Sequence, residues 1–247
     1  MRYLAMVMMM GIAGCATVSE PRLSESQRNE RVKTLTTLAL SYIEQGSFDR
    51  AVDPLERALA LAPNDQEAML AKAVMLERQG DVQPAEVAYD QLFDAHPDFT
   101  RGRQIYANFL FSIDQIEAAC QALEQVTGDT LYSSRAQAFE NLGQCRDRLG
   151  QPDLALAAYE RANRLDIRRP LPNLVLAERQ FLAGDLQRAT YHYGQYVRRA
   201  QQTARSLWVG IRIAQATGDQ DSQASYELLL RNQFSNSAEY SAWQEWK

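Results

Sequence analysis

Three cysteines and two histidines are the residues of this chain best suited to covalent, metal or acid–base chemistry. Cys15 ends an apolar N-terminal run, whereas Cys120 and Cys145 lie in the middle of the chain. His96 stands before a proline and His192 between two tyrosines, which indicates a turn residue and a satisfied imidazole on a helix. No His/Cys group has metal-ligand spacing, and the chain has neither a glycine-rich phosphate loop nor a Gly-x-Ser-x-Gly elbow. The sequence therefore predicts a protein that is not an enzyme and that holds no metal or cofactor.

The first cysteine follows a secretion signal. Arg2 supplies a positive charge, and the apolar residues 3–13 are too few to cross a membrane, which takes about 20 residues. The order Ile12-Ala13-Gly14-Cys15 resembles the bacterial lipobox, in which the chain is cut before the cysteine and its thiol carries a diacylglycerol. An ordinary signal peptide cut nearby is the alternative.

This resemblance implies a lipoprotein signal peptide over 1–14 and lipidation of Cys15 with acyl chains such as palmitate. Two or three acyl chains would hold the protein durably on a membrane surface. The residue after the cysteine is Ala16, which argues by the same resemblance for the outer membrane, with the protein on its periplasmic face. Residues 15–31 are expected to form a lipidated tether and helix lead-in, and residues 16 to about 28 lack helical periodicity.

Beyond the signal, glycines recur with a period of 34 residues. They lie at Gly46, Gly80, Gly150, Gly184 and Gly218, and a turn-tolerant Asp114 stands where a further glycine is due. Alanine follows most of these positions after five residues, and Leu or Tyr after nine. This is the tetratricopeptide pattern, in which each turn joins two antiparallel helices and the small alanines let these helices approach closely.

The fold class that follows is all-α: a right-handed superhelix of six tetratricopeptide repeats with a C-terminal capping helix. The tetratricopeptide-repeat domain spans 32–247, with repeats at 32–65, 66–99, 100–133, 136–169, 170–203 and 204–237 and the cap at 238–247. Two extra residues break the period between the third and fourth repeats. The net charge of −5 offers no basic field for a phosphate backbone, so nucleic acid is not expected as a partner.

Such a stack presents a concave groove lined by the first helix of every repeat, and such grooves bind segments of other proteins. Positions five, nine and twelve of a repeat should face the groove. In the first three repeats the predicted groove residues are Thr36, Leu40, Ile43, Leu70, Val74, Gln104, Asn108 and Phe111. Their apolar character favours an apolar peptide ligand, but an error of one position in the register would turn some of them into core residues.

Cys120 and Cys145 fall on neighbouring helices of the third and fourth repeats. An oxidising periplasm permits a disulfide between them, which would close a loop of about 25 residues and stabilise the protein by roughly 3 kcal/mol. Two buried free thiols are the alternative.

Three stretches carry a resemblance to a known family. They are Asp129-Thr130-Leu131-Tyr132 leading through Arg135 to Ala138-Phe139-Glu140-Asn141-Leu142-Gly143, then Ala204-Arg205-Ser206-Leu207 with Gly210-Ile211-Arg212, and finally Ser237-Ala238-Glu239-Tyr240. The whole mature chain resembles the tetratricopeptide pilotin lipoproteins of type IV pilus biogenesis. The first stretch is the most specific, because it spans the break in the period.

The resemblance implies a protein that binds subunits of the type IV pilus secretin and travels with the lipoprotein sorting machinery. It would be held in the outer membrane by its lipid anchor, where it would promote localisation and multimerisation of the secretin. In this family the secretin is bound by the N-terminal repeats. Two alternatives stay open: a tetratricopeptide scaffold lipoprotein of another envelope machine such as β-barrel protein assembly, or a periplasmic enzyme, for which no acid or nucleophile cluster is found.

Overall fold

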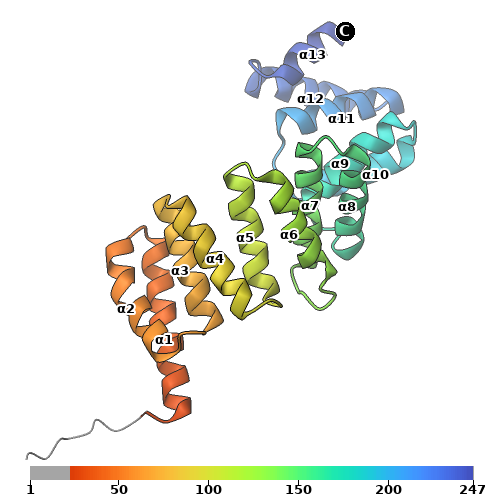
Figure 1. The fold of residues 1–247 in the computed structure, drawn as a ribbon. Coiled ribbons are helices and arrows are strands. Elements are labelled where there is room, and N and C mark those ends of the chain that lie inside the picture. The colour runs from red at the N-terminus through yellow and green to blue at the C-terminus, as the bar shows by residue number, and fades with distance from the viewer. Residues whose placement is uncertain (1–22, 247) are drawn as a thin grey trace, which may run out of the picture. The chain divides into compact units, whose positions relative to one another are not determined.

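The computed structural model describes residues 23–246 and shows an all-helical chain (Figure 1). These residues form thirteen α-helices and no strand, which confirms the predicted all-α class. The helices are α1 (Glu25–Glu44), α2 (Phe48–Leu61), α3 (Gln66–Gln79), α4 (Val82–Ala95), α5 (Thr100–Ser112), α6 (Ile116–Gly128), α7 (Arg135–Arg148), α8 (Pro152–Leu165), α9 (Pro170–Leu182), α10 (Leu186–Val197), α11 (Ala204–Thr217), α12 (Gln220–Gln233) and α13 (Ala238–Trp246). Each predicted repeat holds one pair of helices, although α1 and α7 begin before the repeat bounds. Cys15 and its lipobox lie outside the described residues.

The chain divides into two compact units, Met1–Asp81 and Val82–Lys247, which we call the N-terminal and C-terminal units. The described part of the N-terminal unit contains α1, α2 and α3, and that of the C-terminal unit contains α4 to α13. Within residues 23–246 no helix is long and apolar enough to span a membrane.

The core of the N-terminal unit is built on alanines. Ala39 of α1, Ala51 and Ala58 of α2 and Ala71 of α3 are fully buried beside larger residues such as Leu55. The absence of side-chain bulk beyond Cβ lets the three helices approach closely, so that larger side chains fill the remaining space around the alanines. Ala51 is one of the alanines that recur with the 34-residue period, and its counterparts Ala85, Ala119, Ala155 and Ala189 are likewise fully buried.

Helix α1 begins earlier than the sequence indicated. It starts at Glu25, inside the stretch expected to be a tether without helical periodicity, and that expectation was wrong from this residue onward. The backbone N–H of Gln27 donates to Ser24 Oγ at 3.3 Å, and the backbone N–H of Ser24 donates to Gln27 Oε1 at 2.9 Å. This capping box starts the helix without buried apolar residues, which is why a search for apolar periodicity missed its first turns.

The turns inside the hairpins are where backbone conformation constrains the sequence most. All five glycines of the 34-residue period have a positive φ, in the left-handed region that side chains with a Cβ rarely adopt. Asp114 has a φ of 63° and is the one residue other than glycine with a positive φ in the described chain. This confirms that Asp114 takes the place of the missing glycine, in keeping with the tolerance of Asp for this conformation.

The break in the period lies in the connection between α6 and α7. Asp129 organises this connection, because its carboxylate accepts hydrogen bonds from Thr100 Oγ1 at 2.6 Å and from the backbone N–H of Leu131 at 2.9 Å. Arg135 Nε, at the start of α7, donates to the carbonyl of Thr127 at 2.8 Å. The two extra residues are thus accommodated in a loop that Asp129 attaches to α5 and whose base is closed by a hydrogen bond between α6 and α7.

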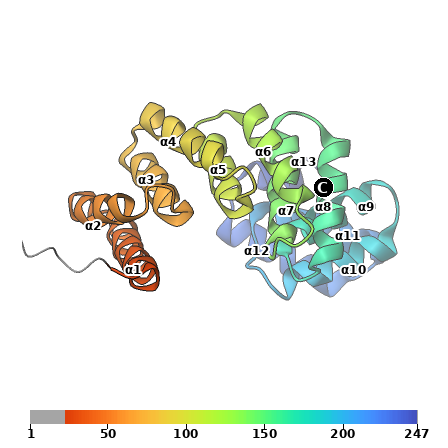
Figure 2. The same cartoon turned by 60° about the horizontal axis from the view of Figure 1, so that its bottom comes forward.

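The last helix, α13, packs within the C-terminal unit as the predicted cap. Trp243 is buried in a cluster with Leu207 and Ile211 of α11 and Leu230 of α12. Figure 2 gives a second view of α9 to α12, whose pairs α9–α10 and α11–α12 are in close contact. The cap therefore covers apolar side chains that the last hairpin cannot bury by itself.

Candidate protein-binding surface

Four of the eight predicted groove residues are core residues. Thr36, Ile43, Leu70 and Gln104 have exposed fractions of 6% or less, so the prediction that they line an accessible groove was wrong. They occupy positions five and twelve of their repeats, which are seven residues apart and share one stripe of a helix. In this chain that stripe faces inward at position five of the first three repeats and at position twelve of the first, where Ile43 belongs to the core of the N-terminal unit; Phe111, at position twelve of the third repeat, is half-buried.

The other four residues remain accessible in part. In the N-terminal unit Leu40 of α1 and Val74 of α3 are half-buried and rest on the edge of the core cluster. Helices α1 and α3 are in contact, so these two aliphatic side chains belong to neighbouring faces of the unit. In the C-terminal unit Asn108 is exposed and Phe111 is half-buried.

Asn108 and Phe111 line a hollow of about 140 Å³ in the C-terminal unit. The wall from α5 also includes Ala107, and the hollow is completed by Leu123 of α6 and by Asn141 and Gln144 of α7. Small-molecule pockets typically enclose about 300–1,000 Å³, so a hollow of this size suits one or two side chains of a protein segment instead. Its floor is apolar and its rim carries carboxamides.

The carboxamides have hydrogen-bonding capacity left for a ligand. Asn108 Oδ1 accepts from Asn141 Nδ2 at 3.2 Å, but the amide nitrogen of Asn108 and the whole amide of Gln144 make no hydrogen bond within residues 23–246. A carboxamide both donates and accepts, as the backbone of an extended peptide does. The hollow can therefore pair with the backbone of a bound segment while Phe111 and Leu123 contact one of its apolar side chains.

A disulfide between Cys120 and Cys145 lies beside the hollow. It joins α6 to α7 with a Cα–Cα distance of 5.7 Å, and both cysteines are buried. Cys120 is one turn from Leu123, and Cys145 directly follows Gln144. The two helices that carry these lining residues are thus covalently linked where the repeat period is broken.

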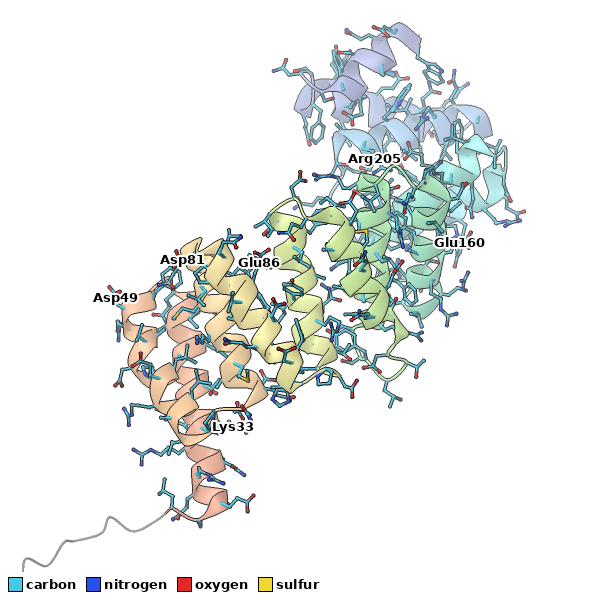
Figure 3. All side chains as sticks on the ribbon, in the orientation of Figure 1. Lys33, Asp49, Asp81, Glu86, Glu160 and Arg205 are labelled. Carbon is cyan, nitrogen blue, oxygen red and sulfur yellow. A yellow bond between two sulfur atoms is a disulfide. The ribbon has the colours of Figure 1, made fainter. Side chains whose placement is uncertain are left out.

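A chain of ion pairs follows the first helices of the later repeats. Glu140 of α7 pairs with Arg169, and Glu178 of α9 pairs with Arg205 at 2.7 Å and with Arg212 at 3.2 Å. Burial alone would raise the pKa of Glu178, but the hydrogen bonds and positive charges of the two arginines outweigh it and hold the pKa below its usual value. Arg205 is labelled in Figure 3.

Sequence reasoning missed these pairs, although one signal could have found them. Glu178 and Arg212 are 34 residues apart, and so are Asp114 and Arg148, which pair at 2.7 Å. Opposite charges one period apart lie side by side on adjacent hairpins. The guanidinium of Arg148 also lies 5.4 Å from the ring centre of Phe111, so this pair borders the hollow.

The histidines have structural surroundings. His192 is half-buried, and its Nδ1 lies 2.9 Å from Oδ1 of the fully buried Asn173, which it can reach as a donor. Burial and then the charge of Arg188 lower the pKa of His192, so the neutral imidazole is favoured. His96 lies in the turn after α4. Among the described residues no group of three or more His, Cys, Asp or Glu is placed to hold a metal ion.

Comparison with known proteins identifies the class to which these helical hairpins belong. The family model described as tetratricopeptide repeat matches residues 36–98 and 110–170, and the chain is therefore a tetratricopeptide-repeat protein. The type IV pilus assembly protein PilF of Pseudomonas aeruginosa is 30% identical over 243 residues, which cover 98% of this chain and 96% of that protein.

Solved structures narrow the class further. A structure from the functional characterisation of Pseudomonas aeruginosa PilF matches with a TM-score of 0.80 and 30% identity, over 89% of this chain and 99% of that one. PilW, described as a widely conserved type IV pilus biogenesis factor, matches with a TM-score of 0.63 and 26% identity, over 85% of this chain and 97% of that one. The chain belongs to the PilF/PilW family of tetratricopeptide-repeat proteins of type IV pilus biogenesis.

Proposed function

We propose that this protein is the pilotin of a type IV pilus secretin. It is a non-catalytic lipoprotein, held by acyl chains on Cys15 at the periplasmic face of the outer membrane, that binds secretin subunits. The lipoprotein sorting machinery carries the complex to that membrane, where the secretin assembles into its multimer. The observation that carries the proposal is the conjunction of membership in the PilF/PilW family with an accessible hollow suited to a protein segment.

Binding would use the accessible residues of the first helices. An extended segment of the secretin would form hydrogen bonds with Asn108 and Gln144 and insert an apolar side chain against Phe111. In the N-terminal unit Leu40 and Val74 offer a second, aliphatic contact. Because the hollow is small, most of the binding free energy would come from a few anchoring side chains of the partner.

The lipid anchor would make binding directional. Binding keeps secretin subunits from associating elsewhere, and the acyl chains then decide at which membrane the complex resides. The protein would not need to catalyse a reaction for this role, because reversible binding of the secretin and attachment of the lipid to one membrane are sufficient.

The test of binding is co-purification of the secretin with the full chain from detergent-solubilised membranes. We expect Phe111→Glu to reduce recovery of the secretin at least tenfold, because it removes the aromatic ring that would contact the apolar side chain of the segment and places a carboxylate in the hollow instead. Leu154→Glu is the matched control, since Leu154 is 54% exposed on α8 and belongs to no hollow described above. Full recovery with Phe111→Glu would refute the role of the hollow, and recovery of a β-barrel assembly complex in place of the secretin would refute the proposal.

The test of anchoring is Cys15→Ser. This variant should keep its helical content and its binding to the secretin, while secretin multimers disappear from the outer-membrane fraction. Normal multimers in that fraction would contradict the anchoring role.

A further inference from the structure

One end of the hairpin α9–α10 carries an unusual pair of tripeptides. Ile167-Arg168-Arg169 precedes α9, and Val197-Arg198-Arg199 ends α10 and leads to α11. The two helices are antiparallel and closely packed, and Asn173 near the start of α9 contacts His192 in the second half of α10. The two tripeptides therefore lie at the same end of the hairpin. We call residues 161–169 and 197–199 the basic edge.

The basic edge is positively charged, although the chain as a whole is negatively charged. It contains six arginines and one acidic residue, whereas the whole chain has a net charge of −5. Three of the arginines have carboxylate partners, in Glu160, Asp166 and Glu140. The other three have none within residues 23–246; these are Arg161, Arg198 and Arg199, and all three are exposed. Glu160 is labelled in Figure 3.

Aliphatic side chains are exposed among these arginines. Leu165 is 43% exposed, and Ile167 and Val197 are also accessible. Leu131, in the neighbouring α6–α7 connection, is 93% exposed even though Asp129 holds the backbone of that connection in place. None of these side chains is buried in the core of the C-terminal unit, and they lie near arginines that have no carboxylate partner.

A polar hollow of about 380 Å³ separates the α6–α7 and α8–α9 connections. Its lining includes the hydroxyl-bearing residues Thr130, Tyr132 and Ser134, the arginines Arg135, Arg168 and Arg169, and one carboxylate, that of Asp166, which pairs with Arg168. Hydroxyl and guanidinium donors without a matching number of carboxylates are suited to phosphate oxygens.

We propose that the basic edge docks on an anionic phospholipid surface. The guanidinium groups contact lipid phosphates, one headgroup enters the polar hollow, and Leu131, Ile167 and Val197 enter the boundary between headgroups and acyl chains. Positive charge next to exposed aliphatic residues is the combination by which proteins bind to the surface of a bilayer. The charges and aliphatic groups lie in the last turns of helices and in the connections between them, and not in a groove, which favours an extended surface over a single protein segment. This inference does not depend on the identity of the protein partner.

The test is hydrogen exchange, followed by mass spectrometry, of the full chain mixed with vesicles. One set of vesicles is phosphatidylcholine alone, and the other contains about a quarter phosphatidylglycerol. We expect exchange in peptides covering 163–170 and 196–203 to slow at least about threefold with the anionic vesicles only, and to recover in 0.5 M salt, because about that concentration screens charges within a few ångströms. The turn around Gly184, at the opposite end of the same hairpin, should not change. A local measurement is chosen because an N-terminal anchor would hold the chain on both kinds of vesicle.

Paired variants decide whether the arginines are responsible. Arg198→Glu with Arg199→Glu should abolish the protection, while Arg179→Glu with Arg188→Glu, the same charge change at the opposite end of the hairpin, should preserve it. Equal exchange on both kinds of vesicle, or protection that survives the first pair of changes, would overturn the proposal. Protection by a polyglutamate peptide but not by anionic vesicles would also overturn it, in favour of an acidic protein partner.

Discussion

Removal of the Cys120–Cys145 disulfide should lower the free energy of unfolding of the C-terminal unit by about 3.5 kcal/mol, because the sequence separation of 25 residues sets the entropy of the loop that the bond closes. For a unit of this size each kcal/mol shifts Tm by about 2–4 °C, so the expected fall in Tm is about 7–14 °C. The perturbation is reduction of the wild type or the double change Cys120→Ala with Cys145→Ala. Both side chains are buried, so the alanine variant also loses a small packing contribution.

The assay is thermal unfolding followed by circular dichroism, with thiol labelling of denatured protein in parallel. Reductant should expose two thiols, at Cys120 and Cys145, and lower the Tm of the wild type. It should leave the Tm of the alanine variant unchanged, which controls for other effects of the reductant. Labelling of both cysteines without reductant would show that the bond is absent, and a wild-type Tm that stays constant while both thiols become labelled would refute the entropic reasoning. Because the bond joins the helices that carry Leu123 and Gln144, affinity for the partner should fall with the Tm.

Gly143→Ala should lower the free energy of unfolding of the C-terminal unit by about 1–3 kcal/mol in denaturant unfolding, because the added Cβ would lie 2.7 Å from a buried tyrosine ring. Gly194→Ala should instead stabilise α10 by up to about 1 kcal/mol, because its Cβ would meet nothing closer than 3.6 Å. Equal effects of the two changes would contradict the packing argument. The pKa of Glu178 is lowered in the folded state, so the stability it contributes is present at neutral pH and is lost as the pH falls from about 4.5, its unfolded value, through the lower folded value. The Tm of Glu178→Gln should accordingly fall less than that of the wild type between pH 6 and pH 3, and parallel curves would exclude this contribution. Leu70→Glu should reduce helical content because Leu70 is buried, whereas Val74→Glu should keep the fold and weaken partner binding; intact helicity in Leu70→Glu, measured by circular dichroism, would reverse this assignment.

Local signals in the sequence predicted the elements of the fold well. A left-handed turn demands glycine or a close substitute, so the 34-residue period identified the hairpin turns and singled out Asp114. A close contact between two helices requires a small residue such as alanine in a similarly strict way, so the recurring alanines predicted where the core lies. The start of α1 escaped this reasoning because a capping box, and not apolar periodicity, sets it.

The candidate site was only half predictable. Whether a residue faces a groove depends on the rotation of each helix about its own axis relative to its neighbours. The packing of the hairpins sets that rotation, and the repeat register alone does not predict it. Asn108 and Phe111 line the hollow, whereas Gln104 of the same helix and Thr36 of the equivalent helix α1 are buried in the core. The ion pairs at one-period spacing, such as Glu178 with Arg212, were visible as opposite charges but became pairs only through the stacking of hairpins.

Asp114 links the shape of a turn to the chemistry of the hollow. A glycine at this position would adopt the left-handed conformation more easily, yet it would remove the carboxylate that holds Arg148 at 2.7 Å, and with it the cation that borders the ring of Phe111. The backbone of this turn and the electrostatic surroundings of the neighbouring hollow therefore vary together: any substitution that relaxes the turn also changes the charge that an approaching segment meets. The one hairpin that departs from the glycine pattern is thus the one whose turn carries a charged side chain beside the hollow.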